Sequence, residues 1–331
     1  MKNYGIFPYF NNDEYTVHYT VYENARVFRA KTGGAKRGKT MLNRIYVFIM
    51  AIVAFFSSLF GLGNYGKVKT FYDVHYGSGE REIYDLVVPK GAKGETNLIL
   101  LIHGGAWVSG DKKSSRDSLV SQAANGYCAA ALNYTYVSDK TDINLILDEI
   151  TMALKSIKEK GNELGISVNK VMLYGHSAGG NLSLLYAYSR AAEAPIKPVA
   201  VFGLSAPTDL TDIQSYIDGD FDEETAYNLF SMACGYRFTK ENYEEAKPYL
   251  AKVSPLTFAD SASVPTVLGH GKRDTTVSFS QSEKLDALLT QKGVKHEFIV
   301  FPNSGHDLSG DPEQSDRLYR LLAEYANEYL K

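Results

Sequence analysis

LYGHSAGGNL, at residues 173–182, sets one serine between two glycines. The apolar run before it (170–174) has the pattern of a buried strand, and residues 178–193 are rich in helix-forming side chains. The chain therefore passes from strand to helix at Ser177, through a turn where glycine lets the two elements approach without a Cβ clash. This Gly-x-Ser-x-Gly arrangement is typical of a nucleophile elbow and makes Ser177 a candidate nucleophile, although the pentapeptide alone also fits a serine in an ordinary turn.

A second glycine-containing motif follows another predicted strand. Residues 97–102 (NLILLI) are apolar, and HGGAW (103–107) comes directly after them. Backbone N–H groups at Gly104 and Gly105 are candidates for stabilising negative charge that develops on a substrate oxygen, which is most effective in a site sheltered from water. The competing interpretation is a glycine-rich turn in which Trp107 fills the core.

Among the seven histidines, His306 has the position expected of a general base. It stands in the loop FPNSGHDL (301–308), just after the last predicted strand. A nucleophilic serine on an α/β scaffold is followed along the chain first by its acid and then by its histidine, and His306 fits this order. His176 is adjacent to the serine on a strand-like turn, so its ring is expected to point away from Ser177.

Asp274 is the predicted acid, in the turn after the strand 265–269. A carboxylate there accepts a hydrogen bond from His306 Nδ1, fixes the tautomer of the ring and stabilises the imidazolium. The competing interpretation is an aspartate that caps the helix beginning nearby. Asp209, at the end of another strand, and Asp307, beside the histidine, are rival acids.

The motifs HGGAW, GHSAGG, GHGKRDTTV and SGHDL, in this order, resemble the α/β-hydrolase superfamily. The similarity is greatest to the esterase/lipase branch with an HGG-W oxyanion loop, especially its carbohydrate-esterase-like and feruloyl-esterase-like members, and it covers roughly residues 67–331. It implies a nucleophile, an acid, a base and backbone oxyanion donors at these positions: Ser177, Asp274, His306, Ala178, and Gly104 or Gly105.

Two positions depart from the hormone-sensitive-lipase branch, which usually has a third glycine in the first motif and an aspartate before the serine. Here these positions are Ala106 and His176, which argues against the substrate range of that branch.

Composition excludes several other classes of protein. A net charge of −3 over 331 residues is no nucleic-acid signature, and 44% hydrophobic residues are ordinary for one large or two modest globular domains. The two cysteines, Cys128 and Cys234, cannot form a disulfide framework. No C-x-x-C motif or histidine cluster indicates a metal, and we expect no cofactor.

The N-terminal part differs from the rest in charge. Residues 1–44 contain eight Lys or Arg and three Asp or Glu, and no charged residue stands between Arg44 and Lys67. We interpret 1–40 as an N-terminal segment that ends in a basic linker, and 41–66 as a hydrophobic segment. The apolar run 45–63 is long enough for a transmembrane anchor. A cleaved signal peptide starting at Met41 and a helix docked on a cytoplasmic protein are the alternatives.

From residue 67 onward, strand patterns alternate with helix patterns. An opening antiparallel hairpin is followed by strand patterns near 97–102, 127–132, 170–174, 199–204, 265–269 and 297–301. Helix patterns lie near 115–125, 143–160, 178–193, 279–291 and 312–330. This alternation predicts an α/β-hydrolase fold: a mostly parallel central sheet with helices on both faces. The acidic, Tyr-rich residues 209–253 interrupt the alternation after the strand 199–204. We expect this insertion to form a lid or a pocket wall, and a solvated surface excursion is the alternative.

These features together predict a serine hydrolase that cleaves carboxylic esters through an acyl-enzyme, acting on short-chain, aromatic or carbohydrate-linked acyl groups. Trp107 is a candidate for substrate stacking, with core packing as the alternative. Arylformamidases and serine peptidases share the same triad and are alternative enzyme functions. A non-enzymatic alternative is a catalytically silent, membrane-anchored binding module. The expected partner is a small ester, with the catalytic domain outside the cytoplasm.

Overall fold

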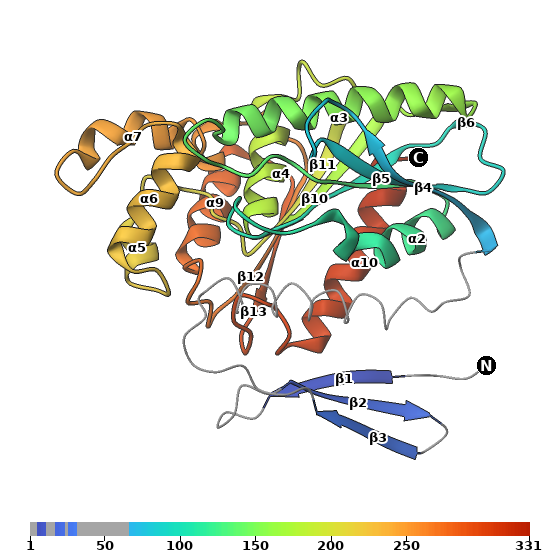
Figure 1. The fold of residues 1–331 in the computed structure, drawn as a ribbon, viewed down its shortest axis with the longest axis horizontal. Coiled ribbons are helices and arrows are strands. Elements are labelled where there is room, and N and C mark those ends of the chain that lie inside the picture. Colours follow the sequence, from blue (N-terminus) through green and yellow to red (C-terminus); the bar gives the residue numbers. More distant parts are fainter. Residues whose placement is uncertain (1–4, 11–16, 24–25, 32–65) are drawn as a thin grey trace.

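The computed structural model describes residues 5–10, 17–23, 26–31 and 66–331 (Figure 1). Its main feature is an eight-stranded sheet with the order β13-β12-β11-β10-β7-β8-β5-β4. The strands are β4 (Val68–His75), β5 (Ile83–Pro89), β7 (Leu98–Ile102), β8 (Cys128–Leu132), β10 (Lys170–His176), β11 (Lys197–Leu204), β12 (Thr266–Gly271) and β13 (His296–Phe301).

Strand direction follows the predicted scheme. β5 pairs antiparallel with β4 and with β8, and the other neighbouring pairs are parallel. The central strands are continuous apolar runs, such as LILLI in β7 and CAAAL in β8, because helices cover the sheet on both faces. The predicted α/β-hydrolase fold, with a mostly parallel sheet, is confirmed.

Helices cover both faces of this sheet (Figure 1). On one face, α3 (Ile143–Glu163), α4 (Ala178–Ser189) and α9 (Ser280–Lys292) share a core with Leu98, Leu100 and Leu173 of the strands. On the other face, α10 (Pro312–Tyr329) packs on β10, β11 and β13, and α2 (Arg116–Ala124) packs on β5 and β8. α4 ends at Ser189, four residues before the end predicted from sequence.

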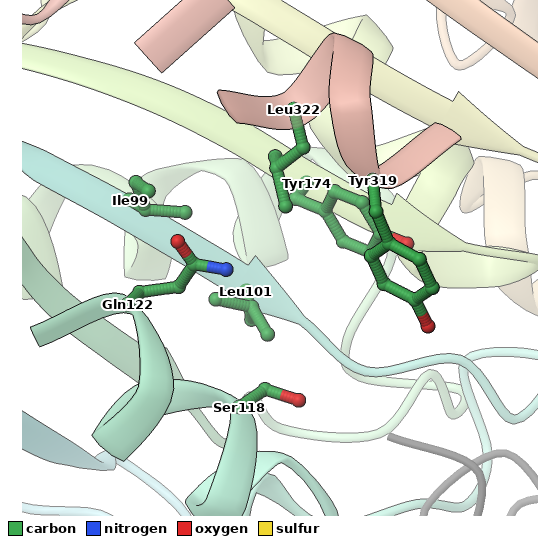
Figure 2. Close-up of a pocket in the computed structure, with 7 residues that line it drawn as sticks. All are labelled: Ile99, Leu101, Ser118, Gln122, Tyr174, Tyr319 and Leu322. Atoms are coloured by element: carbon green, nitrogen blue, oxygen red, sulfur yellow. The ribbon is translucent and has the colours of Figure 1, made fainter. Parts of the chain in front are cut away.

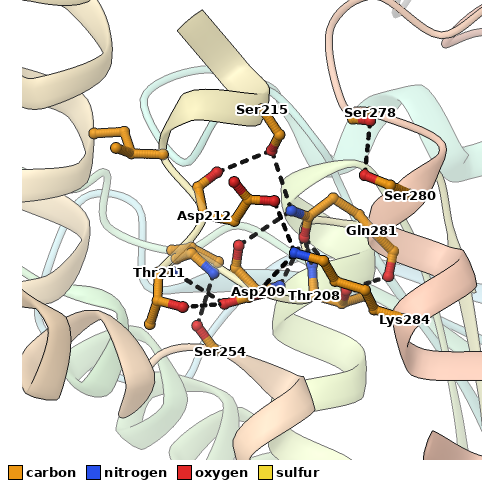
Figure 3. Close-up of polar contacts among 12 residues, drawn as sticks. Thr208, Asp209, Thr211, Asp212, Ser215, Ser254, Ser278, Ser280, Gln281 and Lys284 are labelled. Carbon is orange, nitrogen blue, oxygen red and sulfur yellow. Dashed lines mark hydrogen bonds and ion pairs between the residues drawn. The ribbon is translucent and has the colours of Figure 1, made fainter. Parts of the chain in front are cut away.

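The insertion after β11 is helical. It contains α5 (Gln214–Ile217), α6 (Glu223–Cys234) and α7 (Tyr243–Ala251), which gather at one side of the molecule, and α8 (Pro255–Phe258) follows. A buried glutamine of α9, Gln281, binds the start of the insertion: its Oε1 accepts from the backbone N–H groups of Thr208 (3.0 Å) and Asp209 (2.7 Å) (Figure 3). The insertion is thus fastened to the sheet-covering helix α9.

Two smaller sheets complete the described elements. β1 (Gly5–Phe10), β2 (Val17–Glu23) and β3 (Arg26–Lys31) form an antiparallel sheet, and β6 (Gly94–Glu95) pairs with β9 (Ile166–Ser167).

The predicted anchor, 45–63, lies outside the described residues. Among the helices that are described, none has both the length and the apolar character needed to cross a membrane.

A small cavity of about 20 Å³ lies between α2 and α10 (Figure 2). It is lined by Ile99, Leu101, Ser118, Gln122, Tyr174, Tyr319 and Leu322. A cavity of this size holds about one water molecule, so it is too small for an ester substrate.

Candidate active site

Ser177 stands between the end of β10 and the start of α4. Its backbone has φ 58° and ψ −126°, a conformation that L-residues seldom adopt and that is held only where the surroundings enforce it. The Ser177 N–H donates to Leu204 O of β11 (2.8 Å), which fixes the turn to the neighbouring strand. The strain at this serine is the backbone signature of a nucleophile elbow.

The glycines on either side of Ser177 are required by close backbone packing. A Cβ on Gly175 would collide with Gly179 O, and a Cβ on Gly179 would collide with Ile102 O of β7. Because backbone atoms cannot move aside as a flexible side chain can, both positions need glycine. The motif read from the sequence therefore has a steric cause in the fold.

His306 faces Ser177 from the loop after β13. Its Nε2 lies 2.9 Å from Ser177 Oγ, and its side chain is only 9% exposed. The loop is closed on itself by Asp311, whose carboxylate accepts from Asn303 N (2.9 Å) and Ser304 Oγ (2.6 Å). This turn presents the imidazole from a rigid loop.

Asp274 lies on the far side of the His306 ring. Its Oδ2 is 2.7 Å from His306 Nδ1, and its Oδ1 accepts from the backbone N–H groups of Thr276 and Val277, both at 2.9 Å. Burial alone would raise the pKa of the Asp274 carboxyl, but the His306 charge and hydrogen bonds from His270 and His306 lower it well below its usual range. Asp274 is therefore ionised at neutral pH.

The two rival acids lie elsewhere. The Asp209 carboxylate accepts from Lys284 Nζ (3.1 Å) and Thr211 Oγ1 (2.5 Å) at the base of the insertion. Asp307 accepts from Ser309 N (3.1 Å) in an exposed turn. Asp274 is the candidate acid that the structure brings to His306.

Gly104 packs directly against the elbow. A Cβ built on Gly104 would lie 3.2 Å from Ser177 Cβ and 2.8 Å from His176 O, so only a glycine lets the loop approach this closely. Gly105 follows with φ 115°, and Ala178 is the first residue of α4. The N–H groups of a first helical turn have no partner within the helix, which makes Ala178 a suitable oxyanion donor.

A set of side chains that we did not predict holds the HGGAW loop in place. Tyr136 OH and Arg81 Nη2 both donate to Gly110 O, at 2.6 and 3.1 Å, and the Arg81 guanidinium lies 3.8 Å from the centre of the Tyr136 ring. Tyr134 OH donates to His103 O (3.1 Å). These residues belong to no recognisable motif, because the contacts join segments far apart in the sequence.

His103, the first residue of that loop, is buried against Tyr134 with their ring centroids 4.3 Å apart. Its Nδ1–H donates to Gly104 O (2.8 Å). Burial lowers the pKa of His103 to about 4, so the ring is neutral at physiological pH and its role in the loop is structural.

His176 lies beside the catalytic candidates rather than facing the serine. Its Nε2–H donates to the backbone oxygen of His306 (2.7 Å), and the two rings are 4.8 Å apart. Desolvation and the neighbouring His306 lower the pKa of His176 to about 3. The residue before the nucleophile thus helps to place the loop of the predicted base.

Trp107 is 2% exposed and packs edge-on against Phe230 of α6, with ring centroids 6.4 Å apart. Its indole Nε1 has no hydrogen-bond partner among the described residues. The burial of the ring agrees with the core-packing alternative.

No metal site accompanies these residues in the described part of the chain: no three His, Cys, Asp or Glu side chains are grouped so as to hold an ion.

Comparison with curated proteins found distant relatives that are hydrolases. The chain is 25% identical over 242 residues to the probable isoprenylcysteine alpha-carbonyl methylesterase ICME of Oryza sativa subsp. japonica, covering 70% of this chain and 57% of that protein. It is 23% identical over 243 residues to the kynurenine formamidase of Danio rerio, covering 72% of this chain and 75% of that protein.

Among solved structures, a truncated carbohydrate esterase from gut microbiota is similar with a TM-score of 0.64. The match covers 78% of this chain and 96% of that one at 19% identity, so it concerns the fold. The sequence model of the BD-FAE family matches residues 84–289, which run from within β5 to within α9 and include Ser177, Asp274 and the HGGAW loop. On this match, which spans more than half of the chain, the protein belongs to the BD-FAE family of α/β-hydrolase esterases.

Proposed function

We propose that this protein is a serine esterase that hydrolyses carboxylic esters through an acyl-enzyme intermediate. The observation that carries the proposal is the continuous hydrogen-bonded line from Ser177 Oγ through His306 to Asp274, with distances of 2.9 and 2.7 Å. Membership of an esterase family and the esterase names among the relatives support it.

The proposed reaction uses these atoms directly. His306 Nε2 takes the proton of Ser177 as Oγ attacks the ester carbonyl, and Asp274 stabilises the imidazolium that forms. Backbone N–H groups at Ala178 and at Gly104 or Gly105 bind the oxyanion. His306 then protonates the leaving alcohol, and a water molecule activated by the same ring releases the acid.

The proposed substrates are esters with short-chain, aromatic or carbohydrate-linked acyl groups. The insertion that borders the site is acidic and rich in tyrosine, and an acyl tunnel for long lipid chains would need a mainly apolar lining. Trp107 is the proposed substrate-contacting side chain, because it follows the HGGAW loop glycines and contacts Phe230 of the insertion.

The experiment is Ser177→Ala, assayed on p-nitrophenyl acetate, butyrate and palmitate and on a feruloyl ester. We expect turnover to fall by roughly 10⁴-fold or more, since oxyanion donors and binding alone remain. Wild type should show a higher kcat/KM on acetyl, butyryl or feruloyl than on palmitoyl esters.

The matched control is Ser183→Ala in α4, the helix that follows Ser177, because the buried Ser183 hydroxyl has no hydrogen-bond partner among the described residues. That variant should keep wild-type turnover. Near wild-type turnover in Ser177→Ala would remove this serine from the mechanism, and a preference for palmitoyl esters would refute the proposed substrate range.

Formamide hydrolysis is a second candidate activity, favoured by the similarity to the Danio rerio kynurenine formamidase. The same nucleophile, base and oxyanion donors would attack an N-formyl carbonyl. Comparing kcat/KM on N-formylkynurenine with that on phenyl acetate decides between the two: a higher value on the formamide would assign the protein to arylformamidases.

We also propose that residues 45–63 anchor the protein in a membrane with the hydrolase domain outside the cytoplasm. The proposal rests on the uncharged apolar run and on the basic residues that precede it.

A further inference from the structure

A second histidine contacts the carboxylate of the candidate acid. His270 lies on β12, four residues before Asp274, and is completely buried. Its Nε2 is 3.1 Å from Asp274 Oδ2, the same oxygen that binds His306 Nδ1. Two imidazoles, one from the motif GHGKRD and one from the loop after β13, therefore contact the same carboxylate oxygen.

The orientation of the His270 ring is fixed by its other contacts. Nε2 is also 2.9 Å from Val277 O, and because a carbonyl oxygen only accepts, Nε2 carries a proton. Nδ1 forms a hydrogen bond with Ser282 Oγ of α9, at 2.7 Å. The ring can turn over only by losing both bonds inside the core.

With His270 included, four N–H donors surround Asp274. The backbone N–H groups of Thr276 and Val277 donate to Oδ1, and His306 Nδ1–H donates to Oδ2. The His270 Nε2–H, which is shared with Val277 O, also faces Oδ2 at 3.1 Å. A carboxylate has about four lone-pair positions, so this group is saturated and cannot rotate without breaking a bond. A buried carboxylate with so many donors is held as an anion of fixed orientation.

We propose that His270 is a positioning residue for the triad, which acts by holding Asp274 Oδ2 toward His306 Nδ1, with Ser282 holding the His270 ring. The inference rests on the proposed function, since it assigns His270 a task within that triad. His270 itself does not contact the serine in this scheme, and no proton needs to leave it during the reaction.

The experiment compares His270→Phe and His270→Gln in the full chain, each alone and combined with Asp274→Asn. We expect His270→Phe to lower kcat by about 10- to 100-fold with KM nearly unchanged, a smaller loss than the roughly 10⁴-fold expected for the aspartate itself. His270→Gln keeps a side-chain donor and should restore most of the rate. In the Asp274→Asn background, His270→Phe should change kcat by less than about 3-fold, because the residue acts through the carboxylate.

Wild-type kcat in His270→Phe, or the same fold loss with and without Asp274→Asn, would overturn the inference. His296→Phe is the matched control, because it breaks a histidine–aspartate contact of the same 3.1 Å length, to Asp286, at the surface. If His270→Phe does not fold, Ser282→Ala makes the same test, with a smaller expected loss of kcat. Wild-type kcat in Ser282→Ala, together with unchanged His306 geometry, would count against the proposal.

A readout independent of turnover separates this inference from the proposed function. The low-field proton resonance of the His306–Asp274 hydrogen bond should be lost in Asp274→Asn and shifted in His270→Phe. If wild type neither hydrolyses esters nor reacts with a fluorophosphonate probe, the proposed function fails, while the resonance still tests the positioning. If wild type is active and the resonance is unmoved in His270→Phe, the positioning role alone is wrong.

Discussion

At the scale of single residues, the candidate site depends on a few atoms held in costly positions. Ser177 keeps a positive φ, and Gly104 lies close enough to the elbow that any larger residue would displace the loop. The Asp274 carboxylate is buried yet charged, which its four donors make tolerable. Each of these features costs stability locally, and the surrounding sheet holds them in place.

The acid can be identified by a paired substitution. Asp274→Asn should cut kcat by about 10⁴-fold, because the amide favours the wrong tautomer of His306. Asp209→Asn should change kcat by less than about 5-fold, since Asp209 binds Lys284 and not the histidine. Steady-state kinetics on p-nitrophenyl acetate measure both, with circular dichroism to check folding. A larger loss in Asp209→Asn would show that the acid comes from the end of β11.

His103 should make the protein less stable in mild acid. Its pKa is about 4 in the folded protein against 6.5 for the ordinary group, so the unfolded chain binds a proton over this window and the folded chain does not. The stability that the neutral His103 ring contributes to the folded protein is fully present above pH 6.5. It is lost as the pH falls toward 4, and the free energy of unfolding decreases by at most about 1.4 kcal/mol per pH unit.

The measurement is the free energy of unfolding in urea at pH 7 and pH 5, for wild type and for His103→Gln, whose amide keeps a donor for Gly104 O. The difference between the two proteins should shrink at pH 5. A difference that is independent of pH would mean that His103 does not titrate in this way.

At the scale of elements, the insertion depends on α9. Gln281 is fully buried and binds backbone groups of Thr208 and Asp209, and Lys284, one turn later, pairs with Asp209 (3.1 Å) and Asp212 (2.7 Å) (Figure 3). The insertion also contacts the acid loop: the Asp220 carboxylate accepts from the hydroxyls of Thr275 and Thr276, the two residues after the candidate acid. One helix thus supports both the insertion and, through Ser282, the acid loop.

Gln281 and Lys284, the two side chains of α9 that bind the insertion, should contribute differently to the free energy of unfolding. Gln281→Leu leaves two buried backbone N–H groups without an acceptor and should lower the free energy of unfolding by about 2–4 kcal/mol. Lys284→Met removes two partly exposed ion pairs and should cost less than about 1 kcal/mol. Urea titration of both variants gives the comparison. Equal losses would indicate that the insertion is held by other contacts.

At the scale of the whole molecule, charge divides the chain into two parts. Residues 1–44 have a net charge of +5, and the remaining residues a net charge of −8. The apolar run 45–63 separates them, with its basic neighbours before it and only Lys67 and Lys69 close behind. Under the positive-inside rule, this asymmetry would keep the N-terminal side in the cytoplasm and place the acidic hydrolase part outside.

Protease treatment of intact cells expressing the full chain tests that topology. We expect the hydrolase part to be digested while the cells are intact, and the full-length chain to sediment with membranes until detergent is added. Protection until lysis would show that the orientation is wrong. A full-length chain that stays in the supernatant without detergent would exclude an anchor.

Much of the fold was determined by sequence pattern alone. Strand and helix periodicities predicted all eight strands of the main sheet and the five helices α2, α3, α4, α9 and α10, because each pattern reports which side of an element is buried. The glycines of the two loops were equally readable, since close backbone approach permits only one residue type there.

Other features were decided only by tertiary structure. Asp274 was the acid predicted from sequence, with Asp209 and Asp307 as rivals, and the parallel order of β10, β11, β12 and β13 brought Asp274 to His306. The contacts of Arg81 with the HGGAW loop, and those of His270 and Ser282 with the acid, likewise had no local signal. A hydrogen bond between segments far apart in the sequence forms only if the order of the strands in the sheet brings the two segments together. Sequence periodicity shows which side of each element is buried, but not which elements are neighbours.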